Sequence, residues 1–164
     1  MIKRTLYLLT AMLMFTYGTM SINIFKKRTP KVEPQLQKYF DKLDSIYSAN
    51  DIDIDYSKIS TIQVMDSLPT TPKISGPNYE GLYNRLDYSM YINMNQGPAF
   101  MLGKYEDVIL VIMAHEVAHS QGYGHSNDPC SIMFYSSDYL LYLLLDTEVE
   151  YLVTDIYFSG TPSL

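Results

Sequence analysis

The most informative segment of this 164-residue chain is 115–135, which reads HEVAHSQGYGHSNDPCSIMFY. The nearly all-apolar run 108–114 precedes it and predicts a helix. His115 and His119 are four residues apart, so their imidazole rings project from the same face of that helix, one turn from each other. Two rings placed in this way can share one zinc ion, at about 2.0–2.1 Å each.

The residues after this pair predict a third zinc ligand. Gly122 is the expected end of the helix, because a residue without Cβ adopts the left-handed conformation that reverses the chain. The reversal lets His125 return to the metal, and three neutral imidazoles leave zinc an open fourth position for water, as in catalytic sites. Glu116 lies about 100° around the helix from His115, so it can act on that water without being a ligand.

Two histidines four residues apart are common on helices that bind no metal. In this chain, however, all three histidines fall within 11 residues. The complete pattern H-E-x-x-H-x-x-G-x-x-H is rarely met by chance. We therefore predict one catalytic zinc ion held by His115, His119 and His125.

This pattern resembles, residue by residue, the zinc signature of the metzincin metalloendopeptidases. Met133, in Ser-Ile-Met at 131–133, stands where that clan has its Met-turn, and its distance of eight residues from His125 is most similar to the matrixin branch. The resemblance implies one catalytic Zn²⁺ bound by His115, His119 and His125, with Glu116 as general base and acid and with Met133 supporting the site.

The same resemblance implies an α/β fold of the α+β, zincin-like kind. Its parts are a twisted mixed sheet, an active-site helix, a Met-turn and a C-terminal helix. The clan binds its substrate in extended form along an edge strand of the sheet. Apolar and polar residues alternate over 88–94, which makes this segment our candidate for the edge strand.

Tyr135 is where the sequence departs from the matrixin pattern. Matrixins continue Met-Tyr-Pro, whereas this chain reads Met-Phe-Tyr-Ser over 133–136. A Tyr two residues after the Met resembles the astacin arrangement, in which it ligates zinc or stabilises an oxyanion. Astacins have a much longer loop before the Met, so packing in the core or the cleft wall is the alternative for Tyr135. No histidine remains for the second, structural zinc of many matrixins.

Periodicity and turn residues predict the other elements. The predictions are a linker over 29–33, an amphipathic helix over 34–49, a strand over 59–65, a loop over 68–78, an apolar core run over 139–145 and a closing helix from about 149. The acidic run Asp51–Asp55 suggests a calcium site, but it lacks the Gly and the distal Glu of an EF-hand loop. A solvated turn is the expectation there, and calcium binding stays open.

The N-terminal segment 1–28 is predicted to be a signal peptide or a membrane anchor. Two bases precede a run of about ten mostly apolar residues, which is the length of a signal-peptide h-region. Apolar residues resume before Lys26, so residues 6–25 are long enough to attach the chain to a membrane without cleavage.

Two observations leave the export prediction open to alternatives. The three bases over 26–28 favour a cytoplasmic body under the positive-inside rule, and a buried N-terminal helix would also fit. We nevertheless expect export, with residues 29–164 as a single metzincin-like catalytic domain, secreted or anchored outside the cytoplasm.

Composition and charge exclude several classes of protein. Apolar residues make up 47% of the chain and charged residues 18%, as in folded globular proteins. Five of the 12 bases lie in 1–28, which leaves seven bases against 18 acids in the remainder. Such an acidic body would repel phosphates, so we expect no nucleic-acid partner. The single cysteine, Cys130, excludes an intramolecular disulfide framework and is expected to be a small buried side chain.

These observations predict a zinc-dependent metalloendopeptidase that hydrolyses peptide bonds with a zinc-activated water and Glu116 as general base. Two alternatives stay open. One is a zinc hydrolase with a narrow non-protein amide or cell-wall peptide substrate. The other is a non-catalytic, zinc-stabilised surface interaction protein, which Glu116 disfavours because a structural zinc site needs no general base.

Overall fold

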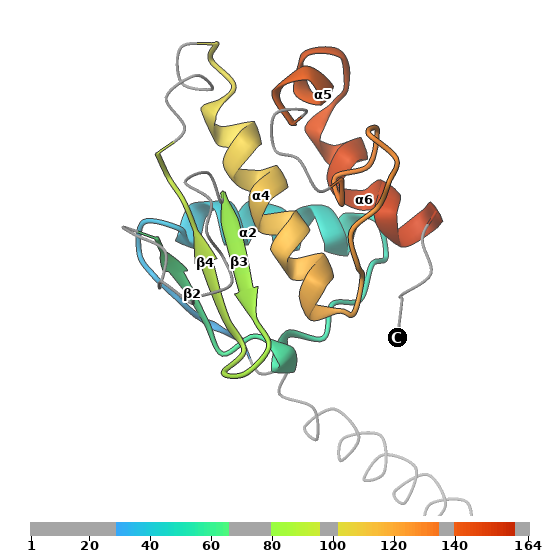
Figure 1. Ribbon diagram of the computed structural model, residues 1–164. Coiled ribbons are helices and arrows are strands. Elements are labelled where there is room, and N and C mark those ends of the chain that lie inside the picture. The colour runs from blue at the N-terminus through green and yellow to red at the C-terminus, as the bar shows by residue number, and fades with distance from the viewer. Residues whose placement is uncertain (1–28, 66–79, 96–101, 135–139, 160–164) are drawn as a thin grey trace, which may run out of the picture.

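The computed structural model describes residues 29–65, 80–95, 102–134 and 140–159, with side chains over 143–157 in the last range (Figure 1). Several predictions fall outside this description: the signal peptide or anchor over 1–28, the loop over 68–78 and Tyr135. For most of the apolar run 139–145, the side chains are not described either. Within the described ranges, none of the helices combines the length and the apolarity needed to cross a membrane.

Four short strands form one mixed sheet in the order β1-β2-β4-β3. Strand β2 pairs in parallel with β1 and with β4, and β3 pairs antiparallel with β4. Ile62 lies opposite Met90 in this register, and both side chains are fully buried. The strand bounds are Lys31–Val32 for β1, Thr61–Val64 for β2, Gly81–Asn84 for β3 and Ser89–Ile92 for β4.

The predicted α/β class with a mixed sheet is confirmed, but the predicted edge strand is wrong. Strand β4 falls within the candidate segment 88–94 and lies between β2 and β3, so it is an interior strand. Among the described strands, the edge on this side is β3, which the sequence did not predict. Alternation correctly identified Met90 and Ile92 as buried, but it reports which face of a strand is buried and not which strands lie beside it.

Strand β1 corrects a second prediction. Residues 29–33 were expected to be a linker because prolines bracket them, yet Lys31 and Val32 pair with β2. The backbone N–H of Glu33 also donates to the carbonyl of Ile62, at 2.8 Å. A two-residue strand leaves no periodicity to detect, and Pro30 and Pro34 stand outside the paired residues.

Helix α4, Tyr105–Ser120, is the central element of the fold. It packs against β3 and β4, and helices α2, α5 and α6 contact it in turn (Figure 1). Its buried residues lie on all sides of the helix, which explains the nearly all-apolar sequence. The other helices are α2, Gln37–Ala49, α5, Leu140–Asp146, and α6, Val149–Ser159, with a short 3-10 turn η2 at Tyr56–Lys58.

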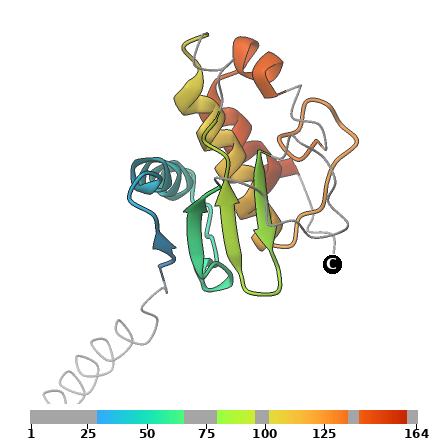
Figure 2. The same cartoon turned by 60° about the vertical axis from the view of Figure 1, so that its left-hand side comes forward.

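The flanking helices largely follow the predictions. Helix α2 lies within 34–49 and buries Tyr39, Phe40, Leu43 and Tyr47. Helix α6 is the predicted closing helix, and it packs on α4. In α5, Leu144 is buried whereas Leu145 is 54% exposed, so the apolar run there is only in part core. Figure 2 shows the sheet side by side with this helical layer.

Two smaller predictions have different outcomes. In the acidic run 51–55 the three Asp residues are exposed, whereas Ile54 is buried in the core. Asp51 has a φ of 56°, and Asp55 accepts a hydrogen bond from the N–H of Ser57 at the start of η2. Cys130 is exposed, so the prediction of a buried side chain is wrong. It sits in the loop after α4, where its N–H donates to Asp128 at 2.9 Å.

Candidate metal centre

Three imidazole rings converge at the end of α4. His115 and His119 lie one turn apart on that helix, and His125 returns to them from the following loop. The ring centroids are 4.6 Å apart for His115 and His119, 4.8 Å for His119 and His125, and 5.4 Å for His115 and His125. One nitrogen from each ring lies within 4.8 Å of the others. In the part of the chain that the structure describes, this is the one group of His, Cys, Asp or Glu found so placed.

The return of His125 depends on how α4 ends. Gly122 has a φ of +98°, which L side chains rarely adopt. Its N–H donates to the carbonyl of His119, and the N–H of Tyr123 donates to that of Ala118, both at 3.1 Å. These two bonds form a Schellman motif around a left-handed glycine, so the predicted helix end at Gly122 is confirmed.

Backbone carbonyls orient the two helical imidazoles. Nδ1 of His115 lies 2.6 Å from the carbonyl oxygen of Ile132, and Nδ1 of His119 lies 2.8 Å from that of Tyr123. A carbonyl only accepts hydrogen bonds, so each Nδ1 carries the proton and donates it. Each Nε2 then has its lone pair free, and metal-binding histidines typically donate their other ring N–H to an acceptor in this way.

The free nitrogens are also close to one another. Nε2 of His119 lies 3.2 Å from Nε2 of His125. Two ligand nitrogens about 2.0–2.1 Å from a tetrahedral zinc would be separated by about this distance. The donor set of three imidazoles, with two orientations fixed by the backbone, therefore fits zinc.

The loop after α4 holds the third histidine near the first. The N–H of Ser126, next to His125, donates to the carbonyl of Met133 at 2.8 Å. Met133 and Ile132 are both buried, and Ile132 supplies the carbonyl that orients His115. Met133 therefore lies in a loop that is hydrogen-bonded both to His115 and to the neighbour of His125. This is the region where the Met-turn was expected.

Burial keeps the helical histidines neutral. Desolvation lowers the pKa of His115 to about 4, against the hydrogen bond to Ile132, which raises it, and the other two histidines lower it slightly further. Desolvation also lowers the pKa of His119, against its hydrogen bond to Tyr123. A neutral imidazole is the form that binds a metal, so both candidate ligands are in that form at neutral pH.

Glu116 is almost completely buried, with 5% of its surface exposed. Its side chain lies against the backbone of β3 at Gly81, where an added Cβ would come within 2.6 Å of Oε1. Desolvation raises the pKa of Glu116 to about 8, and a hydrogen bond from the backbone of Tyr83 opposes that rise. A carboxyl group with a raised pKa next to a metal-binding histidine is typical of a general acid or base.

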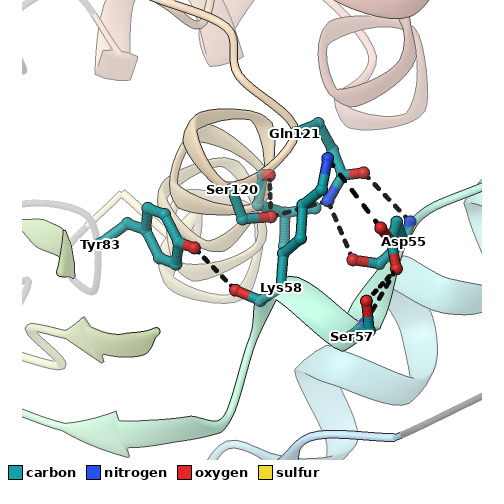
Figure 3. A network of polar contacts seen from close by, with 7 residues as sticks. Asp55, Ser57, Lys58, Tyr83, Ser120 and Gln121 are labelled. Carbon is teal, nitrogen blue, oxygen red and sulfur yellow. Dashed lines mark hydrogen bonds and ion pairs between the residues drawn. The ribbon is translucent and has the colours of Figure 1, made fainter. Parts of the chain in front are cut away.

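A polar network holds the region around the end of α4 (Figure 3). The side chain of Gln121 accepts a hydrogen bond from the N–H of Asp55 at 3.0 Å, and its amide donates to the hydroxyl of Ser120 at 2.8 Å. On the other side of the same turn, the hydroxyl of Tyr83 donates to the carbonyl of Lys58 at 2.7 Å. Helix α4 and strand β3 are therefore both attached to the segment 55–58.

The sequence missed four contributors to this centre. Ile132 and Tyr123 act through their carbonyl oxygens, so no side-chain pattern could have identified them. Tyr83 acts through its backbone and its hydroxyl together. Gly81 carried a usable signal, because a glycine within a short β-strand often marks a close approach of another group.

The chain was compared with protein-family models, with curated proteins and with solved structures, and none of them matches it.

Proposed function

We propose that this chain is a zinc-dependent metalloendopeptidase of the metzincin type. The observation that carries the proposal is the convergence of His115, His119 and His125, with two of the rings oriented by backbone carbonyls. Among the described residues, the group holds three candidate ligands, and three protein ligands with an open fourth position are typical of catalytic rather than structural zinc sites.

The roles of the residues follow from their chemistry. The three histidines would hold the ion, and zinc, when bound, supplies Lewis acidity that activates water and polarises a carbonyl group. Glu116 accepts the proton of the attacking water and delivers it to the departing amine. Its buried position between α4 and β3 raises its affinity for the transferred proton, and the positive charge of a bound zinc ion would favour the carboxylate form that accepts this proton.

Strand β3 is the proposed site of the substrate backbone. It lies at the edge of the described sheet and packs against α4, which carries two of the histidines. Among the described strands, β4 is its one neighbour. An extended peptide can add to such an edge by main-chain hydrogen bonds, and this places the substrate beside the helix that carries the candidate base.

Export completes the proposal. Residues 1–28 would act as a signal peptide or would anchor the chain, and residues 29–164 would act outside the cytoplasm on peptide or protein substrates. Tyr135 is retained as a candidate zinc ligand or oxyanion stabiliser.

The test is zinc content together with casein cleavage, measured on the full chain and on its Glu116→Gln variant. The amide keeps the size of the side chain but cannot accept the water's proton, so we expect one zinc per chain in both proteins and cleavage in the wild type alone. A loss of about 10²-fold or more in kcat fits removal of a general base. Cleavage retained by the variant would contradict the mechanism, and a wild type without zinc would contradict the metal centre.

Zinc bound by both proteins without casein cleavage by either would contradict a general peptidase. That result would favour the narrow amide or cell-wall peptide substrate, or the non-catalytic, zinc-stabilised protein.

A further inference from the structure

Strand β3 approaches Glu116 so closely that a side chain at position 81 would force Glu116 to move. An ideal Cβ built on Gly81 would lie 2.6 Å from Oε1, 2.8 Å from Cγ and 3.0 Å from Cδ of Glu116. The contacted atoms include Cγ, near the helix, so the side chain cannot avoid a methyl group by a small turn of its carboxylate alone. Glu116 therefore occupies the space that a side chain at position 81 would need.

The same strand also binds the carboxylate of Glu116. The backbone of Tyr83, two residues along β3, hydrogen-bonds the carboxylate. Gly81 and Tyr83 are thus two residues of one strand that meet the same side chain. One provides the space for Glu116, and the other provides a hydrogen-bond donor.

Tyr83 is in turn anchored outside the sheet. Its hydroxyl donates to the carbonyl of Lys58 at 2.7 Å (Figure 3). Three residues before Lys58, at the N-cap of η2, the backbone N–H of Asp55 donates to the side chain of Gln121, which directly follows α4. The segment 55–58 thus fixes the distance between the strand that covers Glu116 and the helix that carries it.

We propose that Gly81 and Tyr83 are the positioning residues of the general base, and that β3 holds the Glu116 carboxylate in one orientation between the strand and the histidines' helix. The expected effect on catalysis rests on the proposed function. The expected effect on stability, through the close contact of Gly81 with Glu116, does not. Because an extended substrate would pair with β3, the strand then fixes the substrate and the base relative to each other.

The structural consequence is tested by a double-mutant cycle on the full chain, with thermal unfolding as the measurement. Gly81→Ala should lower Tm by about 3 to 9 °C, the shift expected for overpacking in a domain of this size. In a Glu116→Ala background the space is vacant, so the same change should lower Tm by less than about 2 °C.

Each outcome of the cycle decides the matter. Equal losses in the two backgrounds would overturn the inference, because Gly81 would then matter for a reason other than Glu116. If Gly81→Ala alone does not fold, recovery of folding by Glu116→Ala supports the inference, and failure of the double variant to fold overturns it.

The catalytic consequence is tested by the separation of kcat from KM. Tyr83→Phe removes the anchor to Lys58 and keeps the strand, so we expect kcat to fall about threefold to tenfold with KM and zinc content unchanged. Tyr91→Phe on the neighbouring strand β4 is the matched control and should leave kcat unchanged. Equal effects of the two variants, or a change in KM alone, would overturn the positioning role. A wild type that cleaves nothing would contradict the proposed function, and the unfolding cycle would still decide the inference.

Discussion

Glu116 and His115 are adjacent on α4, yet burial shifts their pKa values in opposite directions. It raises the pKa of Glu116 to about 8 and lowers that of His115 to about 4. Both shifts favour the uncharged form of the side chain, because desolvation disfavours charge. In the metal-free protein, α4 therefore carries two adjacent neutral side chains at pH 7.

These shifts predict how the stability of the metal-free protein depends on pH. The raised pKa of Glu116 means that the folded protein binds more protons than the unfolded chain from about pH 4.5 to 8, so its contribution to the free energy of unfolding falls as pH rises. The lowered pKa of His115 acts in the opposite direction, mainly between about pH 4 and 6.5. Between pH 6.5 and 8 the effect of Glu116 dominates, and we expect a net loss of about 1 kcal/mol.

Urea unfolding of the chelator-treated protein at several pH values measures this loss. Glu116→Gln is the control, since an amide resembles the protonated carboxyl group and does not titrate. We expect the variant to keep its free energy of unfolding constant, or to gain slightly, over the same range. A wild type whose stability rises steadily from pH 6.5 to 8 would contradict the buried, protonated Glu116.

At this scale, the sequence predicted the three converging histidines and could not predict what orients them. The four-residue and six-residue spacings follow from helix geometry and from one glycine turn, so they are visible in the chain. The two histidines on the helix are oriented by the backbone carbonyls of Ile132 and Tyr123, and every residue type has such a carbonyl. Their identity depends on the path of the loop, which no local pattern encodes.

The end of α4 is the element on which the metal centre depends most. Gly122 reverses the chain with a φ of +98°, and Tyr123 immediately offers its carbonyl to His119. His125 follows two residues later. A change in the conformation of this one turn would therefore displace both the orienting carbonyl of one ligand and the backbone of another.

We predict that Gly122→Ala loses zinc affinity as well as stability. A Cβ in the left-handed region costs about 1 kcal/mol. Displacement of the acceptor that hydrogen-bonds a metal-binding histidine typically costs about 10-fold to 100-fold in metal affinity. Gly103→Ala is a matched control, because Gly103 also has a positive φ, 68°, but lies before the start of α4, away from the histidines. Zinc titration with a competing chelator distinguishes the two variants, and equal affinities would contradict the role of the turn.

The helices were more predictable than the strands for a physical reason. Helices α2 and α4 are 13 and 16 residues long, so each repeats its apolar pattern over several turns. Strands β1 and β3 have two and four residues, and β3 has no fully buried residue among Gly81–Asn84. The position of β3 in the fold is set by its pairing with β4 and its packing on α4. Both are tertiary contacts, which local sequence does not report.

At the scale of the whole molecule, charge is separated from the proposed chemistry. The candidate metal centre brings together three imidazoles and a buried carboxyl group, whereas the acidic residues outnumber the basic ones by 18 to 12 over the chain. Nearly all of the charge imbalance therefore lies outside the site. A net negative body changes the local concentration of charged substrates without changing the groups that react.

We therefore predict a preference for cationic peptides that depends on salt, provided that the chain is the peptidase proposed above. Two substrates with the same cleaved core, one flanked by Lys and one by Glu, should differ about 10-fold in kcat/KM at about 20 mM salt, because long-range attraction accelerates encounter. At about 0.5 M salt the Debye length falls to a few ångströms, so the ratio should approach one. The core supplies the specificity contacts in both peptides, which makes each the control for the other. A ratio that does not change with salt would show that the preference comes from contacts at the cleavage site and not from the field of the acidic body.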